Sequence, residues 1–324
     1  MEKRAKRMIF GAGAAAVGAA VFGLIHNFTL NKLMKIAIGR DVPKIIAKNE
    51  GRSSVAGEEL SFKTHPDVIA GREYLQSCDC ETVETMSFDG LKLVGHWYAG
   101  ENPKRVIIAM HGWRSSWIND FGVISEFWHK NGCAVLYADQ RSQGGSDGEY
   151  ISFGMLERHD CLSWIKWVCE RTELPVYLAG VSMGAATVLM TSGFELSENV
   201  RGIIADCGYT SPKAIWKHVV ENNMHLPYGL YSAGVDEECR KKIQHGADDC
   251  SCAEALKNCK VPVLFIHGTD DKFVPVEMTY ENYKACASSK RLFIVPGASH
   301  GMSYMVDTEG YQREIKEFWA DYDA

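Results

Sequence analysis

From about residue 81 to the C-terminus, short apolar runs alternate with segments of helix length. The apolar runs are Arg105–Met110, Ala134–Ala138, Val176–Ala179, Gly202–Ala205, Val261–Ile266 and Arg291–Val295. Helices are predicted at Asn119–Lys130, Met155–Arg171, Ala185–Phe194, Val276–Ala287 and Tyr311–Tyr322. Continuous apolar strands separated by helices are typical of a mostly parallel sheet covered on both faces. Ligands of such sheets bind at the carboxyl ends of the strands, so we expect the chemistry in the loops that follow them.

Two runs with alternating polarity precede the first apolar strand. They are Thr82–Phe88 and Leu91–Tyr98, and they flank Asp89-Gly90. This dipeptide is favoured in two-residue hairpin turns. We therefore expect an antiparallel hairpin ahead of the parallel strands.

Residues 1–26 have a different character from the rest of the chain. Four basic side chains in residues 1–7 precede Met8–Ile25, a segment without charge. A helix of about eighteen residues spans about 27 Å, which is enough for a thin hydrocarbon layer. We expect an uncleaved, single-span membrane anchor, with a signal-like segment as the alternative. The count of basic residues on the two sides favours an N-terminus inside and a main domain outside, but the odd number of cysteines favours the opposite, so the side of the membrane that the main domain occupies stays open.

Small residues recur every four positions in this segment, at Gly11, Ala15, Ala19 and Gly23. Such a ladder would let two helices associate closely, which makes self-association a hypothesis. Simple richness in alanine and glycine also explains the spacing. Residues 27–80 then form a predicted connector, in which Leu30, Leu33, Met34 and Ala37 follow helical spacing. We expect this stripe to pack on the domain that follows, residues 81–324.

The sequence Gly180-Val181-Ser182-Met183-Gly184 lies directly between a predicted strand and a predicted helix. In this context G-x-S-x-G forms a nucleophile elbow, a tight turn that lifts the serine hydroxyl clear of the sheet. The alternative is a glycine turn with a serine that caps the helix. The pattern predicts Ser182 as a nucleophile.

A serine hydroxyl needs a base to take its proton and an acid to orient that base. The loop after Val261–Ile266 contains His267, Asp270 and Asp271, and the loop after Arg291–Val295 contains His300. The chain order of nucleophile, acid and histidine suits this architecture. We expect His300 to be the general base, with Asp270 or Asp271 as its partner.

These motifs together resemble the α/β-hydrolase superfamily, in its esterase and serine-aminopeptidase-like branch, which also includes monoglyceride-lipase-like enzymes. The resemblance runs from about Thr82 to the C-terminus. It implies an α/β-hydrolase fold with a short helical cap, inserted at about residues 211–260. It also implies that Asp271, four residues after the histidine of the H-G pair, is the catalytic acid, with Asp270 as the runner-up.

An oxyanion hole requires two backbone N–H groups directed at the developing negative charge. Met183, the residue after the nucleophile, is expected to supply one. Family members similar to this chain use the residue after the first H-G pair, which is Trp113 here. The indole of Trp113 is expected either in the acyl pocket or in the core, and Arg114 either on a substrate carboxylate or in solvent. Tyr209, which follows the strand Gly202–Ala205, is a third candidate substrate contact.

Composition limits the remaining possibilities. The net charge of −6 argues against a nucleic-acid partner. Eleven cysteines, an odd number without a C-x-x-C pair, indicate a reducing environment and predict no metal site. Cys207, close to the expected site, is interpreted either as a reactive thiol or as a buried structural one. The triad chemistry requires no metal or organic cofactor.

The sequence therefore predicts a membrane-anchored serine hydrolase that acts on a small acyl substrate through an acyl-enzyme intermediate. A carboxylesterase or lipase-like enzyme is the first expectation. A serine aminopeptidase-like amide hydrolase is the alternative, and it would need an acidic side chain for the substrate amine. A non-catalytic, membrane-tethered binding protein on the same fold is the third possibility.

Overall fold

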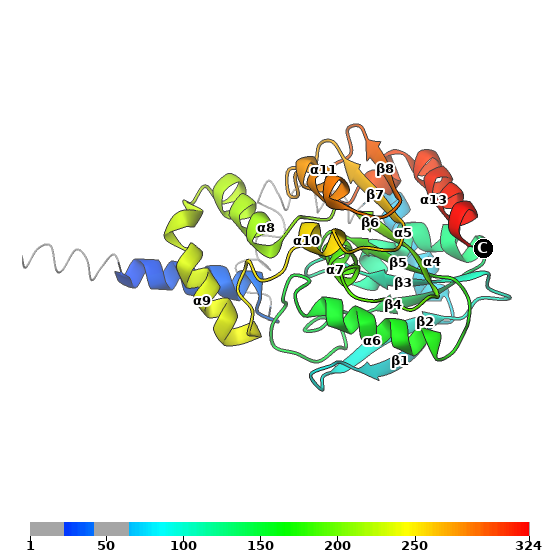
Figure 1. Cartoon of the computed structure of the whole chain (residues 1–324), viewed down its shortest axis with the longest axis horizontal. Helices are drawn as coiled ribbons and strands as arrows, with labels where there is room; N and C mark the ends of the chain where they lie inside the picture. The colour runs from blue at the N-terminus through cyan, green and yellow to red at the C-terminus, as the bar shows by residue number, and fades with distance from the viewer. Residues whose placement is uncertain (1–22, 42–64, 324) are drawn as a thin grey trace, which may run out of the picture.

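The structure, a computed structural model, describes residues 23–41 and 65–323 of the 324-residue chain. Its centre is an eight-stranded sheet in the order β1-β2-β4-β3-β5-β6-β7-β8 (Figure 1). The strands are β1 (Glu81–Met86), β2 (Lys92–Tyr98), β3 (Arg105–Met110), β4 (Cys133–Ala138), β5 (Val176–Val181), β6 (Val200–Asp206), β7 (Val263–Gly268) and β8 (Lys290–Val295). β2 pairs antiparallel with β1 and β4, and the other neighbours are parallel. The predicted mostly parallel sheet is confirmed.

Helices cover both faces of this sheet. One face carries α4 (Pro66–Ser77), α5 (Trp117–Lys130) and α13 (Thr308–Tyr322), and the other carries α6 (Glu157–Cys169), α7 (Met183–Thr191), α10 (Cys252–Leu256) and α11 (Val276–Ala285). The short α12 (Ser303–Val306) lies just before α13. Every residue of β3 and β4 is buried, as strands covered on both faces require. Five of the six apolar runs are buried strands for this reason, whereas β8, at the edge of the sheet, is mostly half-buried.

The hairpin of β1 and β2 differs from the expected two-residue turn. Ser87 pairs with Leu91 through a backbone hydrogen bond of 2.9 Å, which leaves three residues in the loop. The Ser87 hydroxyl accepts from Leu91 N at 2.7 Å and donates to Asp89 at 2.6 Å. The loop is therefore closed by Ser87 and Leu91 instead of Phe88 and Leu91, and Gly90 takes the left-handed conformation that the turn requires.

The expected insertion after β6 contains the helical elements of the cap. They are α8 (Pro212–His218), a π-helical turn (Val219–Asn223), a 3₁₀ turn (Tyr228–Leu230) and α9 (Ser232–Ile243). Figure 1 shows them to one side of the sheet, connected back to it through α10. Trp216, Val220 and Val235 are buried within this region, so the cap is packed on the domain.

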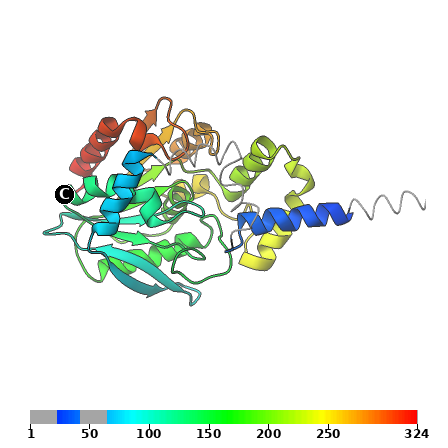
Figure 2. The same cartoon turned by 180° about the vertical axis from the view of Figure 1, so that it is seen from behind.

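Residues 23–37 are helical, and they lie along the cap beside α9 in both views (Figure 2). Leu30, Met34 and Ile38 are buried in the same apolar core as the cap. None of the helices within residues 23–41 and 65–323 combines the length and apolar character needed to cross a bilayer. The span predicted at Met8–Ile25 lies almost entirely outside the described residues. The described residues therefore do not test the predicted anchor.

Candidate active site

Ser182 lies on a sharp turn between β5 and α7. Its backbone has φ +55° and ψ −115°, a conformation that non-glycine residues rarely adopt. Glycine is required on both sides, because a Cβ on Gly180 would overlap the Gly184 backbone and a Cβ on Gly184 would overlap the Met110 carbonyl. The sequence pattern G-x-S-x-G therefore follows from the close packing of β3, β5 and α7.

Ser182, His300 and Asp271 form one continuous hydrogen-bonded chain. The Ser182 Oγ lies 2.9 Å from His300 Nε2, and His300 Nδ1 lies 2.7 Å from Asp271 Oδ2. The three residues follow the carboxyl ends of β5, β8 and β7, which the parallel sheet brings to one edge. Asp270, the runner-up, is exposed and accepts a hydrogen bond from the Thr269 hydroxyl. This geometry is that of a nucleophile, a base and an orienting acid.

The Asp271 carboxylate is held by four donors. Oδ1 accepts from the backbone amides of Phe273 and Val274, both at 2.9 Å, and Oδ2 accepts from His267 Nε2 at 3.1 Å as well as from His300. Burial by itself would raise the pKa of Asp271, but His300 and His267 hold it well below its usual range. The acid therefore stays ionised and fixed in orientation.

His267 is a residue whose role the motif analysis did not assign. Its Nε2 lies between Asp271 Oδ2 and the Val274 carbonyl oxygen, which are both acceptors, so this nitrogen carries the proton. Its Nδ1 then accepts from the Thr279 hydroxyl at 2.6 Å. The H-G-x-x-D spacing, which places His267 four residues before Asp271, is the sequence feature that could have predicted this contact.

Cys207 lies close to His300, on a left-handed backbone with φ +49°. One ligating atom each from Cys207, Asp271 and His300 lie within 4.8 Å of one another, the one metal-capable cluster found in residues 23–41 and 65–323. The His300 and Asp271 atoms already bond to each other, and burial raises the pKa of the Cys207 thiol to about 11. A neutral, buried thiol fits the structural interpretation of Cys207 better than the reactive one.

Two backbone amides near Ser182, those of Met183 and Trp113, have no hydrogen-bond acceptor among the described residues. Met183 N is the first amide of α7 and has no acceptor within the helix. Gly112, the neighbour of Trp113, is close enough that a Cβ there would lie 3.5 Å from Ser182 Cβ. Both expected oxyanion donors therefore lie beside the nucleophile.

Asp120, in the first turn of α5, was not anticipated as part of this site. Its Oδ2 accepts from Gly112 N at 2.6 Å, and its Oδ1 accepts from the Ser115 hydroxyl. It thereby holds the loop between β3 and α5 that carries the Trp113 amide. An acidic residue in a first helical turn is usually interpreted as a helix-dipole partner, so its sequence position gave no signal.

The three residues expected to touch substrate have their polar groups engaged elsewhere. The Trp113 indole N–H donates to the Ala37 carbonyl at 2.8 Å. All three Arg114 guanidinium nitrogens donate to backbone carbonyls at the end of the N-terminal helix. Tyr209 is buried, and its hydroxyl donates to the Phe153 carbonyl at 3.0 Å. Tyr209 is therefore closed off from substrate, whereas Trp113 and Arg114 are half-buried on the loop after β3.

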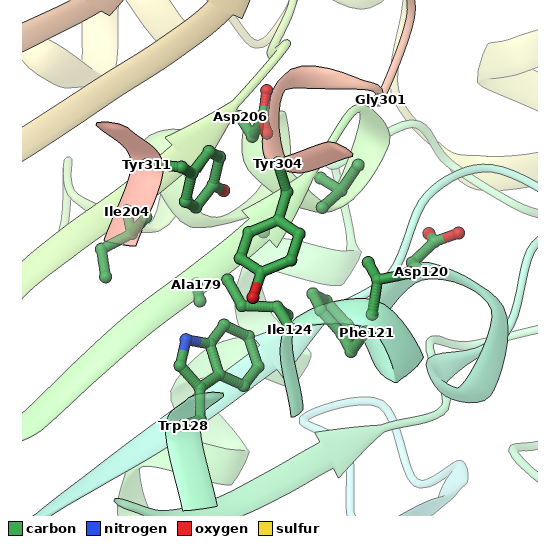
Figure 3. A pocket seen from close by; sticks show the side chains of 13 residues that line it. Asp120, Phe121, Ile124, Trp128, Ala179, Ile204, Asp206, Gly301, Tyr304 and Tyr311 are labelled. Carbon is green, nitrogen blue, oxygen red and sulfur yellow. The ribbon is translucent and has the colours of Figure 1, made fainter. Parts of the chain in front are cut away.

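A small cavity lies on the other side of the triad loops, between α5, the sheet and the α12–α13 segment (Figure 3). Its volume of about 30 Å³ accommodates about one or two water molecules and no acyl chain. Asp206 lines it, accepts from the Ser303 hydroxyl at 3.1 Å and has its pKa raised by burial to about 6. Figure 3 shows Asp206 and Tyr311 at one side and Trp128 at the other. This cavity is therefore too small to be an acyl pocket.

Comparisons with known proteins agree with this fold. Residues 101–225 match the family described as serine aminopeptidase, S33. The chain is 27% identical over 231 residues to the uncharacterized protein YqkD of Bacillus subtilis, covering 71% of this chain and 75% of that one. It is 25% identical to the uncharacterized protein YfhR of Escherichia coli K12, covering 74% and 80%. An esterase structure from Pyrococcus furiosus superposes with a TM-score of 0.63 at 23% identity, covering 78% and 94%, which establishes the fold.

Proposed function

The chain belongs to the α/β-hydrolase superfamily, and we propose that within it the protein is a carboxylic-ester hydrolase acting through Ser182. The observation that carries this proposal is the hydrogen-bonded chain from Ser182 through His300 to Asp271, beside two amides without partners. A serine hydroxyl placed 2.9 Å from a neutral imidazole can lose its proton as it attacks a carbonyl.

In the first half-reaction, Ser182 Oγ bonds to the acyl carbon while its proton moves to His300 Nε2. The amides of Met183 and Trp113 donate to the carbonyl oxygen as it becomes negative. Collapse of this intermediate breaks the bond to the leaving alcohol, which takes the proton from His300. In the second half-reaction, water attacks the acyl-enzyme, again with His300 as base, and releases the acid and free Ser182.

Ester hydrolysis is favoured over aminopeptidase activity by the acidic residues of α9; Glu221, in the π-helical turn, is an exposed cap carboxylate without an ion pair among the described residues. A free substrate amine needs an available carboxylate, and Asp236, Glu237 and Glu238 are the acidic side chains of α9. Asp236 pairs with Arg240 at 3.0 Å, Glu237 with Lys241 at 2.7 Å, and Glu238 with Lys242 at 3.1 Å. These carboxylates are thus already paired with cations on their own helix.

Aromatic rings around the triad supply an apolar environment for an acyl group. Phe273 lies 5.1 Å from the His300 ring, and Phe153 contacts both Trp113 and the cap residue Trp216, at 6.1 and 5.0 Å between ring centroids. Such rings recognise hydrophobic chains and offer little to a charged substrate. We therefore propose a small, uncharged acyl ester as the substrate class.

The test combines active-site labelling with substrate comparison. Wild-type protein should react with a fluorophosphonate probe, and Ser182→Ala should not. Hydrolysis of p-nitrophenyl esters from acetate to laurate should then exceed hydrolysis of aminoacyl p-nitroanilides. Labelling with a preference for the anilides would support the aminopeptidase alternative. A folded wild type that takes no label would overturn the hydrolase proposal and favour a binding protein on this fold.

We also propose that the protein associates with membranes through its N-terminal region. Leu24, Ile25 and Phe28 are largely exposed on the helix of residues 23–37, which continues the uncharged segment of the sequence. Exposed apolar side chains next to such a segment are typical of a lipid-facing surface. Flotation of the full chain with phospholipid vesicles tests this, and protein that remains at the bottom of the gradient with and without vesicles contradicts it.

A further inference from the structure

The C-terminal end of the helix at residues 23–37 rests on the loop that carries the Trp113 amide. Arg114 Nε and Nη2 donate to the Ile36 carbonyl at 3.1 and 2.9 Å, and Nη1 donates to the Arg40 carbonyl at 3.3 Å. The Trp113 indole N–H donates to the Ala37 carbonyl at 2.8 Å. The last carbonyls of a helix have no partner within the helix, so Trp113 and Arg114 satisfy groups that would otherwise be unpaired.

The backbone of this loop is held at two points, one on each side of Trp113. Gly112 N donates to Asp120 Oδ2 at 2.6 Å, and Arg114 N donates to Gln143 Oε1 at 2.6 Å. Arg114 itself has φ +54°, a left-handed conformation that needs support from its surroundings. The Trp113 amide, which lies between these points, keeps its direction only while both flanking residues stay in place.

The helix is in turn fixed to two other parts of the molecule. Its residue Leu30 packs on Gly234 of α9, and the His26 ring stacks on Tyr231 of the cap at 5.0 Å. At its other end, Ile151 N donates to the Ile38 carbonyl at 2.7 Å, and Arg40 donates to the Ser146 carbonyl at 2.8 Å. The helix therefore connects the cap, the loop after β4 and the loop after β3.

We infer that the N-terminal helix contributes to catalysis by holding the loop after β3. Arg114 and the Trp113 indole are the positioning residues through which it directs the Trp113 amide at the oxyanion. This inference rests on the proposed serine-hydrolase function. Oxyanion stabilisation depends on donors that are already oriented before charge develops. Loss of the helix contacts would free the loop and misdirect one of the two donors.

The first experiment compares two arginine variants of the full-length protein. Arg114→Ala removes the guanidinium from the helix carbonyls. Arg171→Ala is the matched control, because Arg171 also donates to a helix carbonyl, that of Trp167 at 2.8 Å, and also lies over a tryptophan ring, at 3.7 Å. Arg171 lies in the turn after α6, ahead of β5, and so away from the strand carboxyl ends that carry the triad.

With p-nitrophenyl acetate, we expect Arg114→Ala to lower kcat about 10- to 100-fold, less than the 10²–10³ seen when an oxyanion donor is removed outright, with little change in KM. Arg114→Lys should recover part of this loss, and Arg171→Ala should behave as wild type. An aryl trifluoromethyl ketone forms an anionic tetrahedral adduct with an active serine. Its affinity should fall by the same factor as kcat/KM in Arg114→Ala, because both depend on the oxyanion donors.

A second pair of variants approaches the loop from the helix. Met34→Ala leaves a cavity beneath the helix, and Ile315→Ala leaves one beneath α13 on the opposite face of the sheet, where both side chains are buried. Both should lower the melting temperature. Only Met34→Ala should lower kcat and weaken the trifluoromethyl ketone, because only that cavity loosens the helix that holds Trp113.

The outcomes separate the two proposals. Wild-type turnover in Arg114→Ala and Met34→Ala overturns the inference while leaving the hydrolase proposal intact. An Arg114→Ala effect confined to KM, and to esters that carry a carboxylate, also overturns it, because Arg114 would then bind substrate. A wild type that takes no fluorophosphonate label defeats the proposed function itself.

Discussion

Replacing Asp271 with asparagine keeps the volume of the side chain but exchanges one of its two acceptor oxygens for an NH₂ donor. The two backbone amides of Phe273 and Val274 donate to Oδ1, so the asparagine oxygen must occupy that position. Its NH₂ group then replaces Oδ2, where it faces His300 Nδ1 and His267 Nε2, which both donate in the wild type. The local bonds thus fix the orientation of the new amide.

His300 can meet this amide only as an acceptor through Nδ1, which moves its proton to Nε2. The protonated Nε2 then faces Ser182 and cannot take the serine proton. The same tautomer error in a Ser-His-Asp protease lowers kcat about 10⁴-fold, which corresponds to about 5.5 kcal/mol of transition-state stabilisation. We expect a loss of this size in p-nitrophenyl acetate hydrolysis, measured as kcat after correction for the spontaneous rate.

Asp270→Asn is the matched control, because the neighbouring side chain is exposed and bonds only to Thr269 among the described residues. It should retain wild-type kcat within about twofold, as expected for an exposed site without a special contact. Circular dichroism and thermal melting establish that both variants are folded. The reasoning is refuted if folded Asp271→Asn keeps more than a tenth of wild-type kcat, or if Asp270→Asn causes the larger loss.

Three further predictions concern pH and stability. Burial lowers the pKa of His300, but the ionised carboxylate of Asp271, 2.7 Å from Nδ1, raises it above its usual value; since the neutral imidazole is the base, kcat/KM should fall as the pH drops through this raised pKa, and an acid limb at or below pH ~6.5 would contradict the assignment. Gly184→Ala should fail to fold stably because its Cβ overlaps the Met110 carbonyl, whereas Gly229→Ala, with open space around it, should change the melting temperature by less than about 3 °C. Arg141→Ala should lower the free energy of unfolding by about 3–5 kcal/mol in urea titrations, because it leaves the buried Asp160 unpaired, and a loss below about 1 kcal/mol would count against that pairing.

The sheet and the triad could be predicted because their signals are local. An apolar run such as Arg105–Met110 identifies a strand that is covered on both faces, whatever its neighbours are. The glycines around Ser182 indicate that backbone segments approach closely there. The chain order of nucleophile, acid and histidine indicated which loops carry the acid and the base. The choice of Asp271 over Asp270 came from the family resemblance. In the structure it follows from four donors that converge on one carboxylate.

The environment of the Trp113 amide could not be predicted, because it depends on contacts between distant segments. Arg114 bonds to carbonyls more than seventy residues earlier in the chain. Those acceptors are backbone atoms, which carry no sequence signal. Asp120 and Gln143 likewise bind backbone amides of the loop. An arginine in a loop is most often solvated, so the sequence favoured an Arg114 side chain in solvent. In the structure its guanidinium is instead bound to the carbonyls of the N-terminal helix.

The position of the N-terminal helix has a consequence for substrate selection. The helix of residues 23–37 is about 22 Å long, and it contacts the cap at Tyr231 and, at Trp113, the loop after β3, here called the oxyanion loop. Substrate contacts that shift the cap should therefore alter the direction of the Trp113 amide, and hydrogen bonds weaken steeply with misalignment. Acyl-chain length should accordingly change kcat as well as KM across p-nitrophenyl acetate to laurate. In Arg114→Ala, kcat should depend less on acyl-chain length than in the wild type, while the dependence of KM on chain length persists. If kcat varies with chain length in the same way in the wild type and in Arg114→Ala, the cap and the oxyanion loop are independent.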